Sequence, residues 1–179
     1  DEGLIKEKIM VQTEEDLKKY KGKDLDEVLL RIGMEKREQL KAELKALGKD
    51  INPLMLIQLP NNDNKLIEKG DKTKEEVVSQ FLAKQSVKNQ HVAKWFDGRQ
   101  ENMDYIKDHD SKTDYMLFKQ AAGTGWDCPR ASVLVMFREI GSDIFYTQTV
   151  GRILRMPEPE MKLGYKDNRR RGGKSRGKK

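Results

Sequence analysis

The feature that most constrains the fold is an uninterrupted apolar run, Leu54-Met55-Leu56-Ile57, in a chain in which 37% of the residues are charged. Alternating polar and apolar residues would indicate a strand with one face in water. A continuous run instead fits a strand that is buried on both faces of a parallel sheet. Because parallel strands need long crossover connections, which are usually helical, the run predicts an α/β fold.

The segments around this run alternate as an α/β fold requires. Residues 14–48 carry apolar residues at i, i+4 and i+7, so they are expected to be mostly helical and to end at Gly48. A capping box from Thr73 to Glu76 predicts the start of an amphipathic helix. The remaining expected elements are strands at His91–Phe96, Tyr115–Lys119 and Ser132–Phe137, followed by a helix at about 143–155. The expected architecture is a mainly parallel central sheet flanked by helices.

The formal net charge of +6 comes from the carboxyl-terminal tail. Seven of the 36 basic residues lie in 169–179, which contains no acid, so the rest of the chain has 29 basic and 30 acidic residues and a net charge of −1. Bulk charge is therefore no argument that the folded part binds nucleic acid. The tail at 161–179 is too polar to offset the entropy of ordering it, and we expect it to be disordered when free.

The cysteine, histidine and hydropathy patterns argue against a disulfide-bonded, a metal-binding and a membrane-spanning protein. The only cysteine, Cys128, excludes an intrachain disulfide, and His91 and His109 lack the spacing of a helical metal pair, so we expect no metal site. No apolar run approaches the roughly 18 residues of a membrane span. The opening residues 1–3 include no initiating methionine and no signal-peptide region, which predicts a domain fragment. We expect a soluble protein of the reducing cytoplasm.

The first candidate site lies on the predicted helix at 143–155. Gln148, Arg152 and Arg155 are spaced i, i+4 and i+7 and therefore share one face, while Gly151 leaves room for a close neighbour. Guanidinium groups suit a transferring phosphoryl group because their planar fork stays charged and can neutralise its oxygens. Taken alone, the spacing fits a surface arginine pair beside a glutamine equally well.

The second candidate site is the segment 120–129, between the strands predicted at Tyr115–Lys119 and Ser132–Phe137. It would lie at a strand's carboxyl end, where open α/β sheets place their ligands. Small residues let backbone amides and a hydroxyl approach a phosphate or ribose, and an aspartate supplies an acceptor. These residues are Gly123, Thr124, Gly125 and Asp127. The alternatives are an ordinary glycine turn, core packing for Trp126 and an inert thiol for Cys128.

Together the two segments resemble motifs V and VI of superfamily 2 helicases, in the region of their carboxyl-terminal RecA-like domain. The sequence at Trp126–Pro129 is most similar to the Res subunits of type III restriction enzymes, and Leu54–Asn61 is similar to the motif IV region of that family. The resemblance covers about residues 51–159. It implies a RecA-like domain at 51–160, preceded by a strand and a helical linker at 1–50 and followed by the tail.

The resemblance also implies functions for individual residues. Arg152 and Arg155 would be an arginine finger and its companion, and Gln148 would sense the γ-phosphate of ATP. Nucleotide contacts would involve Gly125, Asp127 and Gly151, and nucleic-acid contacts Gly123, Thr124 and Asn61. ATP and Mg²⁺ would be held mainly by a first RecA-like domain of the same parent chain. The further partners implied are DNA and a modification methyltransferase subunit of a restriction endonuclease.

Several parts of such an enzyme are missing from the sequence. It contains no G-x-x-x-x-G-K-[ST] phosphate loop, no acidic box for magnesium and no recognisable nuclease core. We therefore expect this chain alone to be inactive. Two alternatives remain open at this stage: a non-catalytic RecA-like module that binds nucleic acid or protein, and the same motor domain in an RNA or repair helicase.

Overall fold

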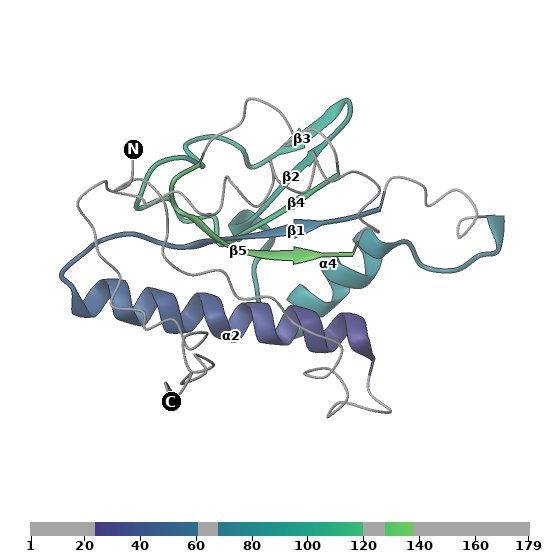
Figure 1. Cartoon of the computed structure of the whole chain (residues 1–179). Helices are drawn as coiled ribbons and strands as arrows, with labels where there is room; N and C mark the ends of the chain where they lie inside the picture. Colours follow the sequence, from purple (N-terminus) through teal and green to yellow (C-terminus); the bar gives the residue numbers. More distant parts are fainter. Residues whose placement is uncertain (1–23, 61–67, 120–127, 138–179) are drawn as a thin grey trace, which may run out of the picture.

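The apolar run at residues 54–57 forms most of an interior strand of a five-stranded sheet (Figure 1). The computed structural model describes residues 24–60, 68–119 and 128–137. In chain order the elements are α2 (Leu25–Ala46), β1 (Leu54–Gln58), α4 (Lys74–Lys84), the 3₁₀ turn η2 (Asn89–His91), β2 (Val92–Phe96), β3 (Arg99–Glu101), β4 (Tyr115–Phe118) and β5 (Ala131–Met136). The four predicted strands are confirmed as β1, β2, β4 and β5, with their ends within one residue of those expected, and the two predicted helices in these ranges are confirmed as α2 and α4.

The strand order is β3-β2-β4-β1-β5. The strands β2, β4, β1 and β5 run parallel, and only β3 is antiparallel, to β2. The prediction of an α/β fold with a mainly parallel sheet is therefore confirmed. Four parallel strands have their carboxyl ends at the same edge of the sheet, which is the property that matters for the candidate sites.

Burial of β1 on both faces accounts for its continuous apolar sequence. All five of its residues are buried. Met55 and Ile57 pack into a cluster with side chains of α2 and α4, whereas Leu54 and Leu56 pack into a second cluster on the other face of the sheet. Since burying a large aliphatic side chain contributes about 1.5–3 kcal/mol, this strand is a main source of stability.

The helix α2 crosses the sheet over β1 and β5 (Figure 1). At Gly33 the backbone comes so close that an added Cβ would lie 2.6 Å from Met55 Cε and 2.8 Å from Val135 Cγ2. The helix ends as predicted: Gly48 has φ of +72°, its N–H donates to Lys45 O, and the next N–H donates to Leu44 O, both at 3.0 Å. This is a Schellman motif, for which glycine is the favoured residue.

The hairpin of β2 and β3 was not predicted. The two strands are joined by Asp97-Gly98, with Gly98 at φ of +71° and Phe96 paired with Arg99. Asp-Gly is a preferred sequence for a two-residue hairpin, so the signal was present in the sequence. It was missed because β3 is only three residues long and fully exposed, and therefore has no apolar alternation. Within the described ranges, neither helix is long and apolar enough to cross a membrane.

Candidate functional site

The carboxyl ends of β4, β1 and β5 lie side by side at one edge of the sheet. Gln58 is in register with Phe118 on β4 and with Met136 on β5. Hydrogen bonds of 2.9 Å continue the pairing one residue further, from Leu59 N to Phe118 O and from Phe137 N to Gln58 O. We call this the carboxyl edge. The chain leaves the sheet there three times, which is the arrangement in which α/β sheets bind ligands.

All the site residues predicted from sequence lie outside the described residues. They are Asn61, Gly123, Thr124, Gly125, Asp127, Gln148, Gly151, Arg152 and Arg155. Their attachment points are described. The segment that begins at Asn61 follows β1, the segment 120–127 follows β4, and the segment from 138 follows β5. The expectation that segment 120–129 begins at a strand's carboxyl end is therefore confirmed for its starting point.

A functional candidate that sequence reasoning missed is Gln58, the last residue of β1. Its side chain is fully buried, and neither Nε2 nor Oε1 has a hydrogen-bond partner among the described residues. Because side chains alternate along a strand, it shares the face of Leu54 and Leu56, away from α2 and α4. Leaving a buried amide unsatisfied costs about 1–3 kcal/mol. The sequence did contain a signal for this residue, because Gln58 is a polar residue directly after the apolar run at 54–57.

Basic side chains lie close to the carboxyl ends of β2 and β4. The Phe96 ring lies under two of them, with Arg99 Cζ at 4.7 Å and Lys119 Nζ at 5.5 Å from its centroid. Lys94 Nζ lies 3.2 Å from Glu75 Oε1, and Arg99 pairs with the same carboxylate. Each cation–π contact of this kind contributes about 0.5–1 kcal/mol at an exposed site. Positive side chains are thus held in place close to the ends of β2 and β4.

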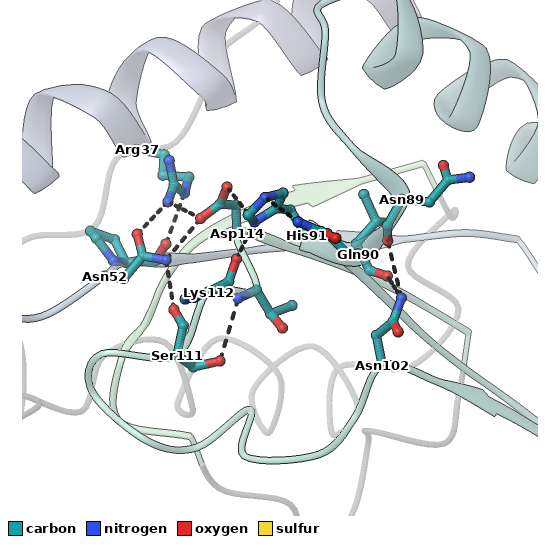
Figure 2. A network of polar contacts seen from close by, with 12 residues as sticks. Arg37, Asn52, Asn89, Gln90, His91, Asn102, Ser111, Lys112 and Asp114 are labelled. Carbon is teal, nitrogen blue, oxygen red and sulfur yellow. Dashed lines mark hydrogen bonds and ion pairs between the residues drawn. The ribbon is translucent and has the colours of Figure 1, made fainter.

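The opposite, amino edge of the sheet carries a polar network that ties α2 to the strand starts (Figure 2). Arg37 is only 2% exposed and donates from Nε to Pro53 O at 2.8 Å and from Nη2 to Asp114 Oδ1 at 2.7 Å. Asn52 Nδ2 donates to the same carboxylate oxygen and to Ser111 O, both at 2.8 Å. The network therefore joins α2 to the loops that precede β1 and β4 through charge-assisted hydrogen bonds.

His91 lies at the end of this network. Its Nδ1 is 2.6 Å from Lys112 O and 3.8 Å from Asp114 Oδ2. A carbonyl oxygen can only accept, so Nδ1 carries the proton, and Nε2 accepts from Gln90 Nε2 at 3.4 Å. Within the described ranges, no three side chains of ligating type are close enough to hold a metal ion.

A second buried guanidinium, that of Arg130, lies at the same amino edge, directly before β5. It donates from Nε to Ile106 O at 2.6 Å and from Nη1 to Asn52 O and Thr113 O, both at 2.8 Å. Burial lowers the pKa of Arg130 and raises the pKa of the neighbouring Cys128 thiol. Cys128 is therefore a buried neutral thiol, in agreement with its interpretation as inert. Arg130 satisfies carbonyls that precede the strands, which is a structural function.

Comparisons of the chain with protein-family models, with curated proteins and with solved structures found no match. The functional inference therefore depends on the sequence motifs and on the edge of the sheet to which they are attached.

Proposed function

We propose that the chain is the second motor domain of an ATP-dependent superfamily 2 helicase or translocase that acts on DNA, most like the Res subunit of a type III restriction enzyme. The observation that carries the proposal is the attachment of the motif-bearing segments to strands that end side by side. The segments at 123–129 and 148–155 follow β4 and β5, whose carboxyl ends flank that of β1. A shared ligand at this edge would explain both motifs.

In this proposal the chain supplies one wall of an ATP site. Arg152 and Arg155 neutralise the charge that develops on the transferring phosphoryl group, and Gln148 senses the γ-phosphate. The phosphate loop and the Mg²⁺ ligands belong to a first RecA-like domain. Thr124 and its glycine neighbours contact the nucleic-acid backbone, which positions the strand but does not encode its sequence.

The buried amide of Gln58 has a natural place in the same proposal. It lies between the two strands that carry the motif segments, and its hydrogen-bonding groups are unused by the described residues. Preorganised polar groups at a ligand edge often cost stability and are retained because the reaction uses them. We infer that Gln58 is a positioning residue whose amide orients a motif segment against ATP.

Replacing Gln58 with methionine is expected to separate function from stability. Met keeps the length of the side chain and removes the unsatisfied amide, so the free energy of unfolding should rise by about 1–2 kcal/mol. ATP turnover of the complete motor should fall about tenfold with an unchanged KM for ATP. The measurements are chemical denaturation of this chain and steady-state kinetics of the motor. The control is Gln100→Met on the exposed strand β3, which should change neither. A stabilised variant with full turnover would contradict the function of the amide.

The isolated chain is expected to hydrolyse no ATP above background, with or without DNA, because positioning and charge neutralisation need both walls of the cleft. The test is phosphate release by the purified chain, first alone and then fused to a phosphate-loop domain of a related motor. Turnover should appear only in the fusion. DNA-stimulated hydrolysis by the chain alone would show that it is not half of a site. A fusion that binds DNA and ATP without turnover would favour a non-catalytic binding module.

A further inference from the structure

A pocket of about 640 Å³ opens at the amino edge of the sheet, next to the network of Arg37 and Asp114. Its volume is in the range of small-molecule sites. Three segments line it: the end of α2 with the residues after it, the 3₁₀ turn η2 before β2, and the loop that leads into β4. The charged and titratable side chains in the lining are Lys41, Lys45, Lys49, Asp50, His91, Asp110, Lys112 and Asp114.

The wall formed by α2 has a continuous basic row. Arg37, Lys41 and Lys45 are spaced i, i+4 and i+8, so they follow one another along one face of the helix. Arg37 lies at the buried end of the row, and the two lysines are exposed and line the pocket. Like charges at i, i+4 destabilise a helix by about 0.2–0.5 kcal/mol per pair. This cost would be offset by a ligand that carries negative charge.

The carboxylates in the lining do not cancel this charge. Asp114 is already neutralised, since it accepts from Arg37 at 2.7 Å and from Asn52 at 2.8 Å. Asp50 and Asp110 remain, against Lys41, Lys45 and Lys112. Lys112 comes from the loop before β4, and its own carbonyl fixes the His91 ring through Nδ1. Cationic donors therefore come from two separate elements.

We propose that this pocket binds a phosphate-bearing ligand of nucleotide size, held by Lys41, Lys45 and Lys112. Lysine ammonium groups act as point charges that suit phosphate oxygens, and hydrogen bonds to charged groups are stronger than neutral ones. The ligand is either a free nucleotide or the terminal phosphate of an oligonucleotide. The pocket lies at the edge of the sheet opposite the carboxyl ends of β4 and β5, so the inference does not depend on the proposed motor function.

The test is isothermal titration of the full chain with inorganic pyrophosphate. Lys41→Gln/Lys45→Gln should weaken binding at least tenfold, because each charge-assisted contact contributes more than the 1.4 kcal/mol that corresponds to a factor of ten. The matched control is Lys69→Gln/Lys84→Gln. It removes the same charge from exposed positions outside the pocket, and Lys84, like Lys45, is in the last turn of a helix. The control should change affinity less than twofold, and all variants keep the basic tail.

Additional experiments identify the source of the phosphate and distinguish binding at this pocket from binding at the carboxyl edge. A 5′-phosphorylated oligonucleotide that competes with pyrophosphate better than its 5′-hydroxyl form would identify a nucleic-acid end, and competition by ADP alone would identify a free nucleotide. Loss of pyrophosphate binding in Arg152→Ala but not in Lys41→Gln/Lys45→Gln would place the ligand at the carboxyl edge and overturn the proposal. Lys112→Gln provides a second variant if the lysine pair on α2 disturbs folding. Equal losses in both double variants, or no saturable binding, would overturn the proposal.

Discussion

Replacing Arg152 or Arg155 with alanine is expected to lower ATP turnover of the complete motor by roughly 10³- to 10⁵-fold while leaving the dissociation constant of ATP within a few-fold. An arginine finger acts on charge that develops in the transition state, whereas ground-state ATP is held mainly by the phosphate loop of the other domain. The value of kcat should therefore fall while the dissociation constant of ATP stays nearly the same. An arginine with only a structural function would lower stability, binding and turnover together.

The measurements are kcat, the dissociation constant of ATP and a thermal melt on the same preparations. Lysine at either position keeps the charge but loses the planar fork, so it should restore only part of the rate. Arg31→Ala, an exposed arginine on α2 that lies over the Phe81 ring, is the control and should keep normal turnover. An alanine variant with near-normal kcat, or one that is inactive only because it is unfolded, would remove the catalytic assignment of that arginine.

The four parallel strands of the sheet could be predicted because their apolar sequences differ from the polar segments around them. The runs at β1 and β4 are apolar and fully buried, and the run at β5 is mostly apolar and at least partly buried, as strands of a parallel sheet require. Capping sequences located the start of α4, where Thr73 and Glu76 form the predicted capping box, and the end of α2 at Gly48. These features are local, so periodicity and turn chemistry are sufficient to find them.

The features that sequence reasoning missed depend on contacts between distant residues. Arg37 and Asp114 are 77 positions apart, and nothing in their neighbourhoods indicates that they share a hydrogen bond. The pocket at the amino edge depends on the same long-range packing of α2 beside the loop before β4. Gln58 lies within the segment 54–61 that resembles motif IV, but its burial is set by strands that pair with β1 from both sides and come much later in the chain. The start of segment 120–129 at the carboxyl end of a strand could be predicted, because the segment follows the apolar run of β4 directly along the chain.

The other large effect is expected at the amino edge. Asp114→Ala should lower the free energy of unfolding by about 3 kcal/mol, because breaking a buried charge pair leaves the remaining charge uncompensated. Arg37 is 2% exposed and would lose the carboxylate at 2.7 Å, although Pro53 O would still accept from its Nε. The value is at the low end for buried pairs because Asp114 itself is 25% exposed.

The same arginine offers a matched control, since it also pairs with Glu38, whose side chain is 61% exposed. Glu38→Ala should cost less than about 1 kcal/mol, as is typical of surface pairs. Arg37→Met removes the buried charge, so combining it with Asp114→Ala should cost clearly less than the sum of the two single changes. A coupling energy above about 1 kcal/mol from urea denaturation of the four proteins would support a true buried pair. Two outcomes would contradict this: Glu38→Ala destabilises as much as Asp114→Ala, or the coupling energy is near zero. The stabilising contact of Arg37 would then not be the one with Asp114. The apolar face of α2 would instead hold the helix to the residues that precede β1 and β4.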